Sequence, residues 1–368
     1  MAPIPSGGTV AVTGAAGFIG SHIVVNLLSK GYRVKACVRN VDDPVRCDFL
    51  KNMPAYKTGR LTLHNGDVDV EGIFDDILPG CHGFCHVSHV SDYGNEEYVQ
   101  GVAANLIASI NKAGTVSRVI FTSSVAGVAP PPFHPSHPGY GSGVVMYEES
   151  YIDEEDPNRI ATRETSSAYS VSKVQSEKLF ADGAEASGGK WDSITLNPSD
   201  NLGPILSPHQ KDMGPWQHNV ELLLRGIYPS EYPGSVVYKP WQIVDVRDCA
   251  AGHVGLLESV KISNGERYIA WSTEMYTLED ISNRIAKLLP ELGYTPPEPT
   301  LDPNAVKSGD AKVAAELEGI WFKSDLRNDR IREAAGVTFR DFDETLRDCV
   351  ESLVGVAGVE TGTFKARM

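Results

Sequence analysis

The stretch TGAAGFIG, residues 13–20, constrains the fold more than any other part of the chain. It directly follows the apolar run TVAV and opens the helix-like pattern FIGSHIVVNLLSKG. In such a strand–loop–helix unit the first glycine permits a tight turn, the second admits a pyrophosphate, and the third lets the helix pack closely. The free N–H groups at the helix start favour phosphates. A plain glycine-rich turn is the alternative. The predicted dinucleotide-binding residues are Thr13, Gly14, Gly17, Phe18, Ile19 and Gly20.

Strand-like and helix-like segments alternate through the first half of the chain. Further strands are predicted at YRVKACVR, GRLTLHNGD, GFCHVS, SRVIFTSS and WDSITLNP. Helices are predicted at GIFDDILPG (72–80), at EEYVQGVAANLIASINKAG and from about Ser167 to Ala186. This alternation is typical of an α/β fold with a Rossmann-type doubly wound parallel sheet.

Beyond Gly203 the alternation loosens, which predicts a smaller C-terminal α/β substrate lobe. We expect a dinucleotide-binding domain from residues 1–203 and about 241–269, and a lobe from about 204–240 and 270–354. Residues 355–368 lack periodicity, and we expect a flexible tail. The proline-rich and glycine-rich stretch that includes 129–143 predicts a loop whose role the sequence leaves open.

Composition excludes several classes of protein. The 368 residues carry a net charge of -15 with a sequence pI near 5.1, which excludes nucleic acid as a partner. No apolar run reaches the roughly 18 residues that suggest a membrane span. The first residues lack the basic and apolar regions of a secretory signal. We therefore expect a cytoplasmic monomer or homodimer with a small-molecule substrate.

The stretch CHGFCHVSH carries Cys81, His82, Cys85, His86 and His89 and could bind zinc. No second ligand pair with finger-like spacing appears elsewhere in the sequence. The segment GFCHV also has the pattern of a short buried strand, on which cysteine behaves as a small apolar residue. We therefore predict no metal.

The end of the second predicted strand decides which dinucleotide is bound. An NAD site needs a carboxylate there for the ribose hydroxyls, whereas an NADP site needs a cation for the 2′-phosphate. Here Arg39 ends the strand and Arg46 follows closely, which favours NADPH over NADH. The nearby Asp42 and Asp43 allow a solvated charge run as the alternative. After the third strand, Asp67 with Val68 is predicted to bond the adenine amino group.

Tyr169 and Lys173 stand four residues apart on a predicted helix, and this spacing places both side chains on one face. A doubly wound sheet binds its ligand at the carboxyl ends of the strands, where Ser123 and Ser124 end the strand VIFTSS. A lysine ammonium lowers the pKa of a neighbouring phenol, and a serine hydroxyl polarises a carbonyl. The three residue types predict proton transfer beside a hydride source.

These motifs resemble the extended short-chain dehydrogenase/reductases. Within them the chain is similar to the dihydroflavonol 4-reductase-like group, which includes cinnamoyl-CoA reductases and fungal methylglyoxal/aldehyde reductases. The resemblance runs from about Gly8 to Val354 and rests on TGAAGFIGSH, VKACVR, GDV, GFCHVS, RVIFTSS, YSVSK, LNPSDNLGP and VDVRDCAAGHV. It implies that Ser124 is the catalytic serine beside Tyr169 and Lys173. The implied contacts to the nicotinamide half of the cofactor come from Val87, Ser88, Ser123, Pro198 and Asn201.

The chain also departs from this group. Ala129 stands where dihydroflavonol reductases carry an asparagine for the flavonoid catechol, and the NWYC segment of cinnamoyl-CoA reductases is missing. A plant flavonoid or CoA ester is therefore not the predicted substrate. Candidates for substrate contact, each with core packing as its alternative, are His89, Tyr93, Tyr140, Trp216 and Trp241.

The leading hypothesis is an NADPH-dependent carbonyl reductase, or alcohol dehydrogenase in reverse, acting on an aldehyde or ketone. A second hypothesis is an NAD-dependent nucleotide-sugar epimerase or dehydratase, for which an acidic residue is expected at the position of Val38. A third is a non-catalytic NADP-sensing protein, against which Ser124, Tyr169 and Lys173 speak.

Overall fold

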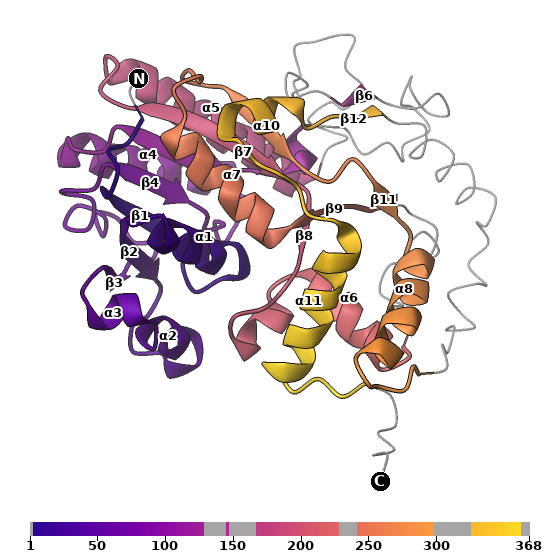
Figure 1. Ribbon diagram of the computed structural model, residues 1–368. Helices are drawn as coiled ribbons and strands as arrows, with labels where there is room; N and C mark the ends of the chain where they lie inside the picture. Colours follow the sequence, from indigo (N-terminus) through magenta and orange to yellow (C-terminus); the bar gives the residue numbers. More distant parts are fainter. Residues whose placement is uncertain (1–2, 129–144, 147–166, 228–240, 298–324, 362–368) are drawn as a thin grey trace.

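The main sheet contains seven parallel strands in the order β10-β7-β5-β4-β1-β2-β3 (Figure 1). The computed structural model describes residues 3–128, 145–146, 167–227, 241–297 and 325–361. The strands are β1 (Thr9–Thr13), β2 (Arg33–Val38), β3 (Leu61–Asn65), β4 (Gly83–His86), β5 (Arg118–Thr122), β7 (Asp192–Pro198) and β10 (Arg267–Ala270). The order reverses between β1 and β4, which confirms the doubly wound Rossmann arrangement.

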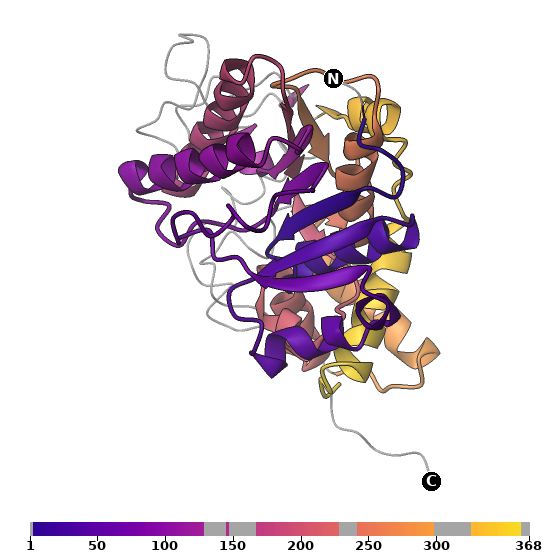
Figure 2. The ribbon, with the colours of Figure 1, turned by 90° about the vertical axis from the view of Figure 1, so that its left-hand side faces the viewer.

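Helices cover both faces of this sheet, as Figure 2 shows. One face holds α1 (Phe18–Ser29), α7 (Val246–Glu258) and α10 (Asp329–Ala335), and the other holds α4 (Glu96–Ala113) and α5 (Ala168–Ala186). Successive strand residues point to opposite faces, so Val10 packs with α1 and Ala11 packs with α4. Of the described helices, none combines the length and apolarity that a bilayer crossing requires.

The helix predicted over residues 72–80 was wrong. The backbone there forms isolated turns, such as the bond from the Asp75 N–H to the Gly72 carbonyl at 3.0 Å. Gly72 and Gly80 have φ values of 72° and 78°, which a right-handed helix does not allow. The apolar residues Phe74 and Leu78 that suggested a helix are buried against β4 instead.

The C-terminal half builds a smaller unit beside the sheet. Its helices are α6 (Pro215–Leu224), α8 (Leu278–Glu291) and α11 (Phe342–Gly355), and its three-stranded sheet has the order β11-β9-β8. These strands are β8 (Asp200–Leu202), β9 (Trp241–Asp245) and β11 (Met275–Tyr276). Trp216, Ile281 and Leu346 pack in its core. The domain boundaries given above stay a prediction, and α10 packs on α7 rather than on this core.

The chain after α11 is partly packed, which corrects the expectation of a flexible segment from residue 355 onward. Val359 is buried in the core of the smaller unit, and Thr361 is buried as well. The aliphatic side chain of Val359 gains free energy from this burial, which opposes the entropy lost on ordering the segment. Residues 362–368 lie outside the described part of the chain.

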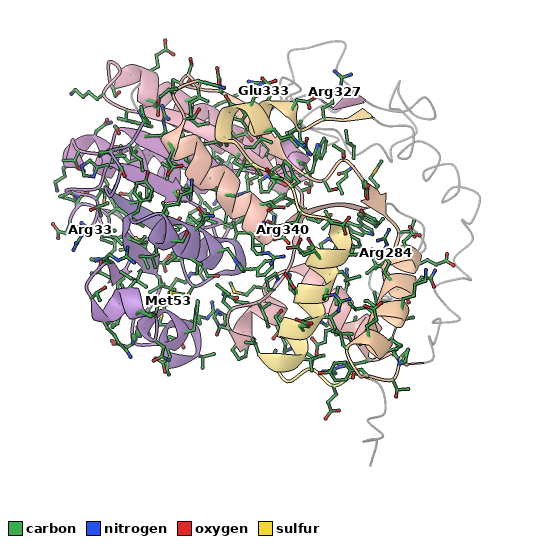
Figure 3. The ribbon with its side chains drawn as sticks, in the orientation of Figure 1. Arg33, Met53, Arg284, Arg327, Glu333 and Arg340 are labelled. Carbon is green, nitrogen blue, oxygen red and sulfur yellow. The ribbon has the colours of Figure 1, made fainter. Side chains whose placement is uncertain are left out.

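Ion pairs join the smaller unit to α7. Arg340, labelled in Figure 3, precedes α11 and pairs with Asp248, whose carboxylate also accepts the Arg340 N–H at 2.6 Å. Arg247 pairs with Asp245 at 2.7 Å and with Asp348 on α11. Because α7 also packs on the main sheet, these contacts fix the smaller unit relative to the strands.

Candidate active site

The glycine-rich loop has the geometry that a dinucleotide cradle requires. Gly14 has a φ of 62°, which favours glycine, and Gly17 precedes the first turn of α1. A Cβ at Gly20 would lie 2.2 Å from the Gly14 carbonyl oxygen, so a side chain there would push α1 off the loop. Among the described residues no side chain caps the first turn of α1. Its N–H groups, which include those of Phe18 and Ile19, therefore suit a pyrophosphate.

Thr13 ties the end of β1 to the end of β4. Its hydroxyl accepts the N–H groups of Val87 at 2.9 Å and Ser88 at 3.0 Å. Because that oxygen already accepts two N–H groups, the hydroxyl donates its own hydrogen bond to Nδ1 of His86 at 3.0 Å. The His86 ring is therefore neutral, with its proton on Nε2. Burial also favours the neutral ring, because it lowers the pKa of His86 to about 3. A Cβ at Gly14 would lie 3.2 Å from the Ser88 hydroxyl oxygen, a tight contact that adds to the preference for glycine set by the positive φ.

A second contact to the loop comes from the 3-10 turn η2 (Pro208–Asp212), which sequence reasoning missed. Nε2–H of His209 donates to the Ala16 carbonyl at 2.9 Å. The Gln210 amide donates to the same carbonyl at 3.2 Å and to the Ser21 hydroxyl at 3.0 Å. The loop is therefore held from outside its own strand–helix unit.

The residues predicted for the adenine end lie at the carboxyl ends of β2 and β3. The Arg39 Nε is 4.0 Å from the Asp67 carboxylate, and Val68 beside it is buried. Arg46 on α2 (Pro44–Lys51) has its Nε 3.6 Å from Asp43. Both arginine side chains are more than half exposed, so these ion pairs are weak and can give way to a phosphate.

The structure brings Ser124, Tyr169 and Lys173 together at the carboxyl edge of the sheet. Ser124 follows β5, and its Oγ accepts an N–H of the 3-10 turn η1 (Val125–Gly127) at 3.2 Å. The Tyr169 phenol hydrogen-bonds the Ser124 side chain. Lys173, one turn along α5, donates from Nζ to the Thr122 carbonyl at 2.9 Å, and this Nζ lies 5.7 Å from the centre of the Tyr169 ring.

Burial governs the pKa values in this group. It raises the pKa of Tyr169 above its ordinary value, the hydrogen bond with Ser124 opposes this, and the charge of Asp200 adds to it. Burial also lowers the pKa of Lys173 to about 8. The sequence predicted that the lysine lowers the pKa of the phenol. This effect stays a prediction, because burial sets the net direction at Tyr169. The Lys173 ammonium bonds the Thr122 carbonyl in this structure.

Two of the residues predicted to contact substrate lie against the tyrosine. The His89 ring stacks on the Tyr169 ring with centroids 5.1 Å apart and an interplanar angle of 10°. Tyr93 meets the same ring edge-on at 5.9 Å. Burial lowers the pKa of His89, so its ring is neutral at pH 7. These two side chains form an aromatic wall beside the phenol.

The two predicted tryptophans have the packing role instead. Trp216 is 1% exposed, and its ring meets Trp241 edge-on with centroids 4.5 Å apart in the core of the smaller unit. An indole fills such a core because of its large apolar area. Tyr140 and Ala129 lie outside the described residues.

The remaining predicted cofactor contacts divide into two kinds. Pro198 ends β7 at the same edge of the sheet as Ser124, and Asn201 follows on β8, where its amide donates to the Ser199 carbonyl at 2.9 Å. The Ser123 hydroxyl instead donates to a buried glutamate within the protein. Its side chain is therefore committed to the interior, although its backbone lies at the rim.

Sequence reasoning missed that glutamate, Glu177, and its neighbours Arg267 and Asn197. Glu177 lies four residues after Lys173, so the helical spacing that linked Tyr169 to Lys173 was the available signal. No local pattern indicates Arg267, because β10 reaches the glutamate only through the sheet topology.

The cysteine and histidine cluster is divided among structural roles. Cys81 and Cys85 are buried in two different cores, on opposite sides of the sheet. Nδ1 of His82 accepts the Thr9 N–H at 3.2 Å, near the start of β1, whereas His86 bonds the side chain at the other end of that strand. The four side chains therefore do not converge on one point.

A different group of ligand types lies within metal-binding distance: Asp212, His218 and Glu221. Two cations neutralise it, since Arg225 pairs with Glu221 at 2.5 Å and Lys211 pairs with the same carboxylate at 3.4 Å. This group is an ion-pair network centred on the buried Glu221, and we assign it no metal.

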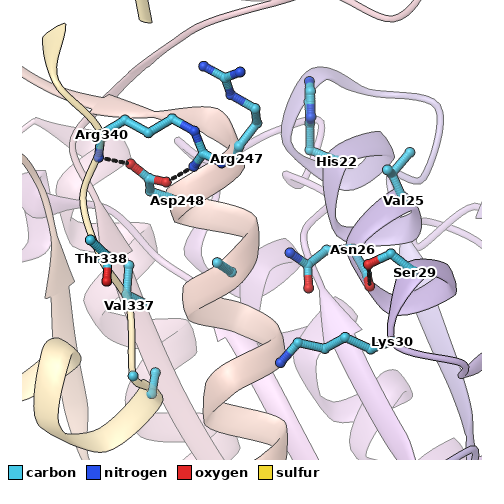
Figure 4. Close-up of a pocket in the computed structure, with 13 residues that line it drawn as sticks. His22, Val25, Asn26, Ser29, Lys30, Arg247, Asp248, Val337, Thr338 and Arg340 are labelled. Carbon is cyan, nitrogen blue, oxygen red and sulfur yellow. Dashed lines mark hydrogen bonds and ion pairs between the residues drawn. The ribbon is translucent and has the colours of Figure 1, made fainter. Parts of the chain in front are cut away.

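A cavity of about 470 Å³ opens between α1, α7 and residues 336–340 (Figure 4). Lys30, Arg247 and Arg340 line it, but each pairs with a carboxylate, for example Lys30 with Glu258 at 2.6 Å. Burial lowers the pKa of His22 to about 4, so this ring adds no charge at pH 7. None of the predicted site residues lines the cavity. It carries no free charge to recruit an anion.

The fold and the loop geometry agree with the comparison to known families. The family model for the NAD dependent epimerase/dehydratase family matches residues 10–270. The match covers more than half of the chain. The protein therefore belongs to this family, the extended short-chain dehydrogenases/reductases.

Within this family the chain is similar to plant reductases. It is 32% identical to dihydroflavonol 4-reductase of Arabidopsis thaliana over 77% of this chain and 70% of that protein. Yeast methylglyoxal/isovaleraldehyde reductase, solved with NADPH, aligns with a TM-score of 0.69 at 22% identity, covering 95% of this chain and 99% of that one. Vestitone reductase from alfalfa (Medicago sativa L.) gives a TM-score of 0.67 at 24% identity, with 95% and 98% covered. The two structural likenesses show the fold.

Proposed function

We propose that this protein is an NADPH-dependent carbonyl reductase that acts on an aldehyde or ketone. The observation that carries the proposal is the convergence of Ser124, Tyr169 and Lys173 at the carboxyl edge of the sheet, above a glycine-rich loop built for a dinucleotide. The reductases among the relatives support the same reaction class. The bound nicotinamide supplies the hydride.

The protein's own residues handle the proton. Because burial raises the pKa of Tyr169, the phenol is protonated at pH 7 and can donate to the carbonyl oxygen as hydride reaches the carbon. The phenolate that remains is stabilised by the charged Lys173 on the same helix face. The Ser124 hydroxyl donates a hydrogen bond to the substrate oxygen and so orients the carbonyl. One hydride and one proton convert the carbonyl to an alcohol.

The proposed cofactor contacts follow the same edge of the sheet. The glycine-rich loop holds the pyrophosphate, and Arg39 with Arg46 binds the 2′-phosphate that distinguishes NADPH from NADH. The nicotinamide half is proposed to lie near Val87, Ser88 and the segment from Pro198 to Asn201. His89 and Tyr93 would then line the substrate side of the phenol.

Tyr169→Phe tests the proposal. This variant keeps the ring that stacks on His89 and removes the proton donor, so kcat for a reducible ketone or aldehyde should fall about 10²- to 10⁴-fold. NADPH affinity, measured by calorimetry, should stay within about twofold because the phenol proton makes no phosphate contact. Tyr56→Phe, on α3 (Pro54–Lys57), is the control and should be fully active. Unchanged turnover of Tyr169→Phe would rule out the proposed mechanism.

An NAD-dependent epimerase is the alternative within the family. The position where such a site needs a carboxylate is Val38, which is buried in the core at the end of β2. Denaturing the purified protein and assaying the supernatant for nicotinamide dinucleotide separates the two functions. Tightly held NAD would favour the epimerase, whereas dissociable NADPH supports the reductase.

A further inference from the structure

A buried ion pair lies one helical turn beyond Lys173. Glu177 on α5 accepts Nε–H of Arg267 on β10 at 2.6 Å, and each side chain is 3% exposed. Two charges buried to this extent remain ionised only when each compensates the other. The pair therefore places the Glu177 carboxylate one turn beyond the lysine on the same helix face, with the Arg267 guanidinium as its counter-charge.

The same pair also forms hydrogen bonds around the segment that carries Ser124. Glu177 accepts hydrogen bonds from the Ser123 hydroxyl and from the Asn197 amide, the latter at 3.0 Å. The Asn197 amide also donates to the Ser124 carbonyl at 3.0 Å. Arg267 donates to the Gly127 carbonyl at 2.9 Å, at the far end of η1. Residues 123–127 are thus bonded on both sides of Ser124 by one buried network.

We propose that Glu177, held by Arg267, is a positioning residue for the proposed reduction. It fixes the backbone that presents Ser124, and its charge keeps Lys173 in the ammonium form. This inference rests on the proposed function, because it names residues that prepare the same proton donor. Glu177 acts through Ser124 and Lys173 and makes no contact with the reacting atoms.

The charge balance around Lys173 supports a role for Glu177. The titratable or charged groups facing this region are Tyr169 and Glu177 on α5, His86 and His89 at the end of β4, Arg267 on β10 and Asp200 on β8. Burial lowers the pKa of Lys173 to about 8, and the charge of Glu177 opposes that shift. Both histidines are neutral at pH 7, because burial lowers the pKa of each. The Asp200 charge acts on Tyr169.

A purely stabilising ion pair is the competing explanation, and the fold supplies a matched control. Arg118 and Asp192 form a pair with exposures of 0% and 1%, bonded at 2.8 Å through two guanidinium nitrogens. They stand at the first residues of β5 and β7, at the opposite edge of the sheet from Ser124. Loss of either pair leaves a buried charge uncompensated, so both losses destabilise the fold.

The test compares Glu177→Gln with Asp192→Asn. In Glu177→Gln the alkaline limb of kcat/KM should move to lower pH by about one unit, because the ammonium loses its anionic neighbour. At pH 8 kcat should fall about fivefold, while KM stays within about twofold. Asp192→Asn should lower the melting temperature yet retain the native pH profile. Glu177→Asp keeps the charge and should restore the alkaline limb even if its kcat is reduced.

A second measurement does not depend on turnover. Acetic anhydride acylates only the neutral amine, so labelling of Lys173 against pH, followed by peptide mass spectrometry, gives its titration directly. We expect this curve to move to lower pH in Glu177→Gln and to stay in place in Asp192→Asn. If Glu177→Gln does not fold, Glu177→Gln/Arg267→Gln replaces it in both measurements, since this variant removes both buried charges.

The kinetic measurement and the Lys173 titration together distinguish the proposed role of Glu177 from the proposed function. An unchanged Lys173 titration would overturn the electrostatic role of Glu177, whether or not a carbonyl is reduced. An unchanged kcat in Glu177→Gln would overturn its role in presenting Ser124. A shifted titration in a protein whose native form reduces no carbonyl would count against the proposed function and leave the role of Glu177 as a positioning residue for Lys173 intact.

Discussion

Two effects compete at the Tyr169 hydroxyl. Burial disfavours the phenolate, and the hydrogen bond with Ser124 favours it; burial is the larger effect. A reductase benefits from this order, since the acid must hold its proton until the substrate arrives. We propose that Lys173 acts in the other direction, since an ammonium that stabilises the phenolate also lowers the pKa of the phenol. Burial and the lysine would then oppose each other at this hydroxyl.

Arg39 is the residue that we propose to set the cofactor preference. Its side chain is 65% exposed and only loosely paired with Asp67, so Arg39→Ala should leave the fold intact. We expect the Kd for NADPH to rise about 10- to 100-fold, while the Kd for NADH changes less than about threefold, because the lost contact is to the 2′-phosphate. Isothermal titration of both cofactors measures this.

Arg33→Ala is the control for that experiment, since Arg33 stands at the opposite end of β2 and donates to the Gly59 carbonyl. It should change neither affinity. Equal losses of NADPH and NADH affinity in Arg39→Ala would contradict the phosphate assignment.

Between elements, the tightest contact of α7 is with the end of α10. A Cβ at Gly255 would lie 2.2 Å from the Ala335 carbonyl oxygen, so Gly255→Ala forces the two helices apart. We expect the free energy of unfolding in urea to fall by about 1–3 kcal/mol. Gly252→Ala, one turn earlier, would meet Leu196 at an ordinary 3.4 Å and should be neutral or stabilising by up to about 1 kcal/mol. Similar losses in both variants would show that packing against α10 does not set the cost.

The sequence predicted those elements whose signal is local. The glycine-rich loop, the strands and the helix carrying Tyr169 follow from periodicity and from residues that only one conformation favours. The segment 72–80 misled because its apolar spacing fits a helix, although it packs as successive turns. Trp216 shows the same limit of sequence-based prediction. The sequence does not tell whether an aromatic side chain faces the substrate or the core, and Trp216 is buried in the core.

The site residues that the sequence did not predict are those paired over long distances along the chain. Glu177 and Arg267 meet only because β10 adds to the sheet beside β7, 90 residues further along the chain. The contact of His209 with the Ala16 carbonyl spans 193 residues. Neither pair has a spacing that a single sequence reveals.

For the molecule as a whole, buried histidines set the response to acid. The pKa values of His22, His86 and His253 are lowered by burial to about 4, 3 and 4, against 6.5 for the free side chain. The unfolded chain therefore binds more protons below pH 6.5, and stability falls as pH drops from 6.5 towards 4. Asp248, whose pKa burial raises to about 6, opposes this with a single group.

We expect the free energy of unfolding to be lower at pH 5.5 than at pH 7.5, with each histidine contributing up to about 1.4 kcal/mol per pH unit below 6.5. Urea unfolding at both pH values measures this. His253→Gln should reduce the difference, whereas His218→Gln, at a surface position 43% exposed, should not. Equal stability of the native protein at the two pH values would contradict the assignment.

The bonds from His209 and Gln210 to the glycine-rich loop have a further consequence for any attempt to redesign this protein. The turn that bears them leads directly into α6 of the smaller unit, which we propose as the substrate side of the molecule. A graft or deletion that displaces this turn would weaken the support of the dinucleotide-binding loop. A change intended to alter substrate binding would then also lower the affinity for the nucleotide. Libraries should therefore keep residues 207–213 fixed.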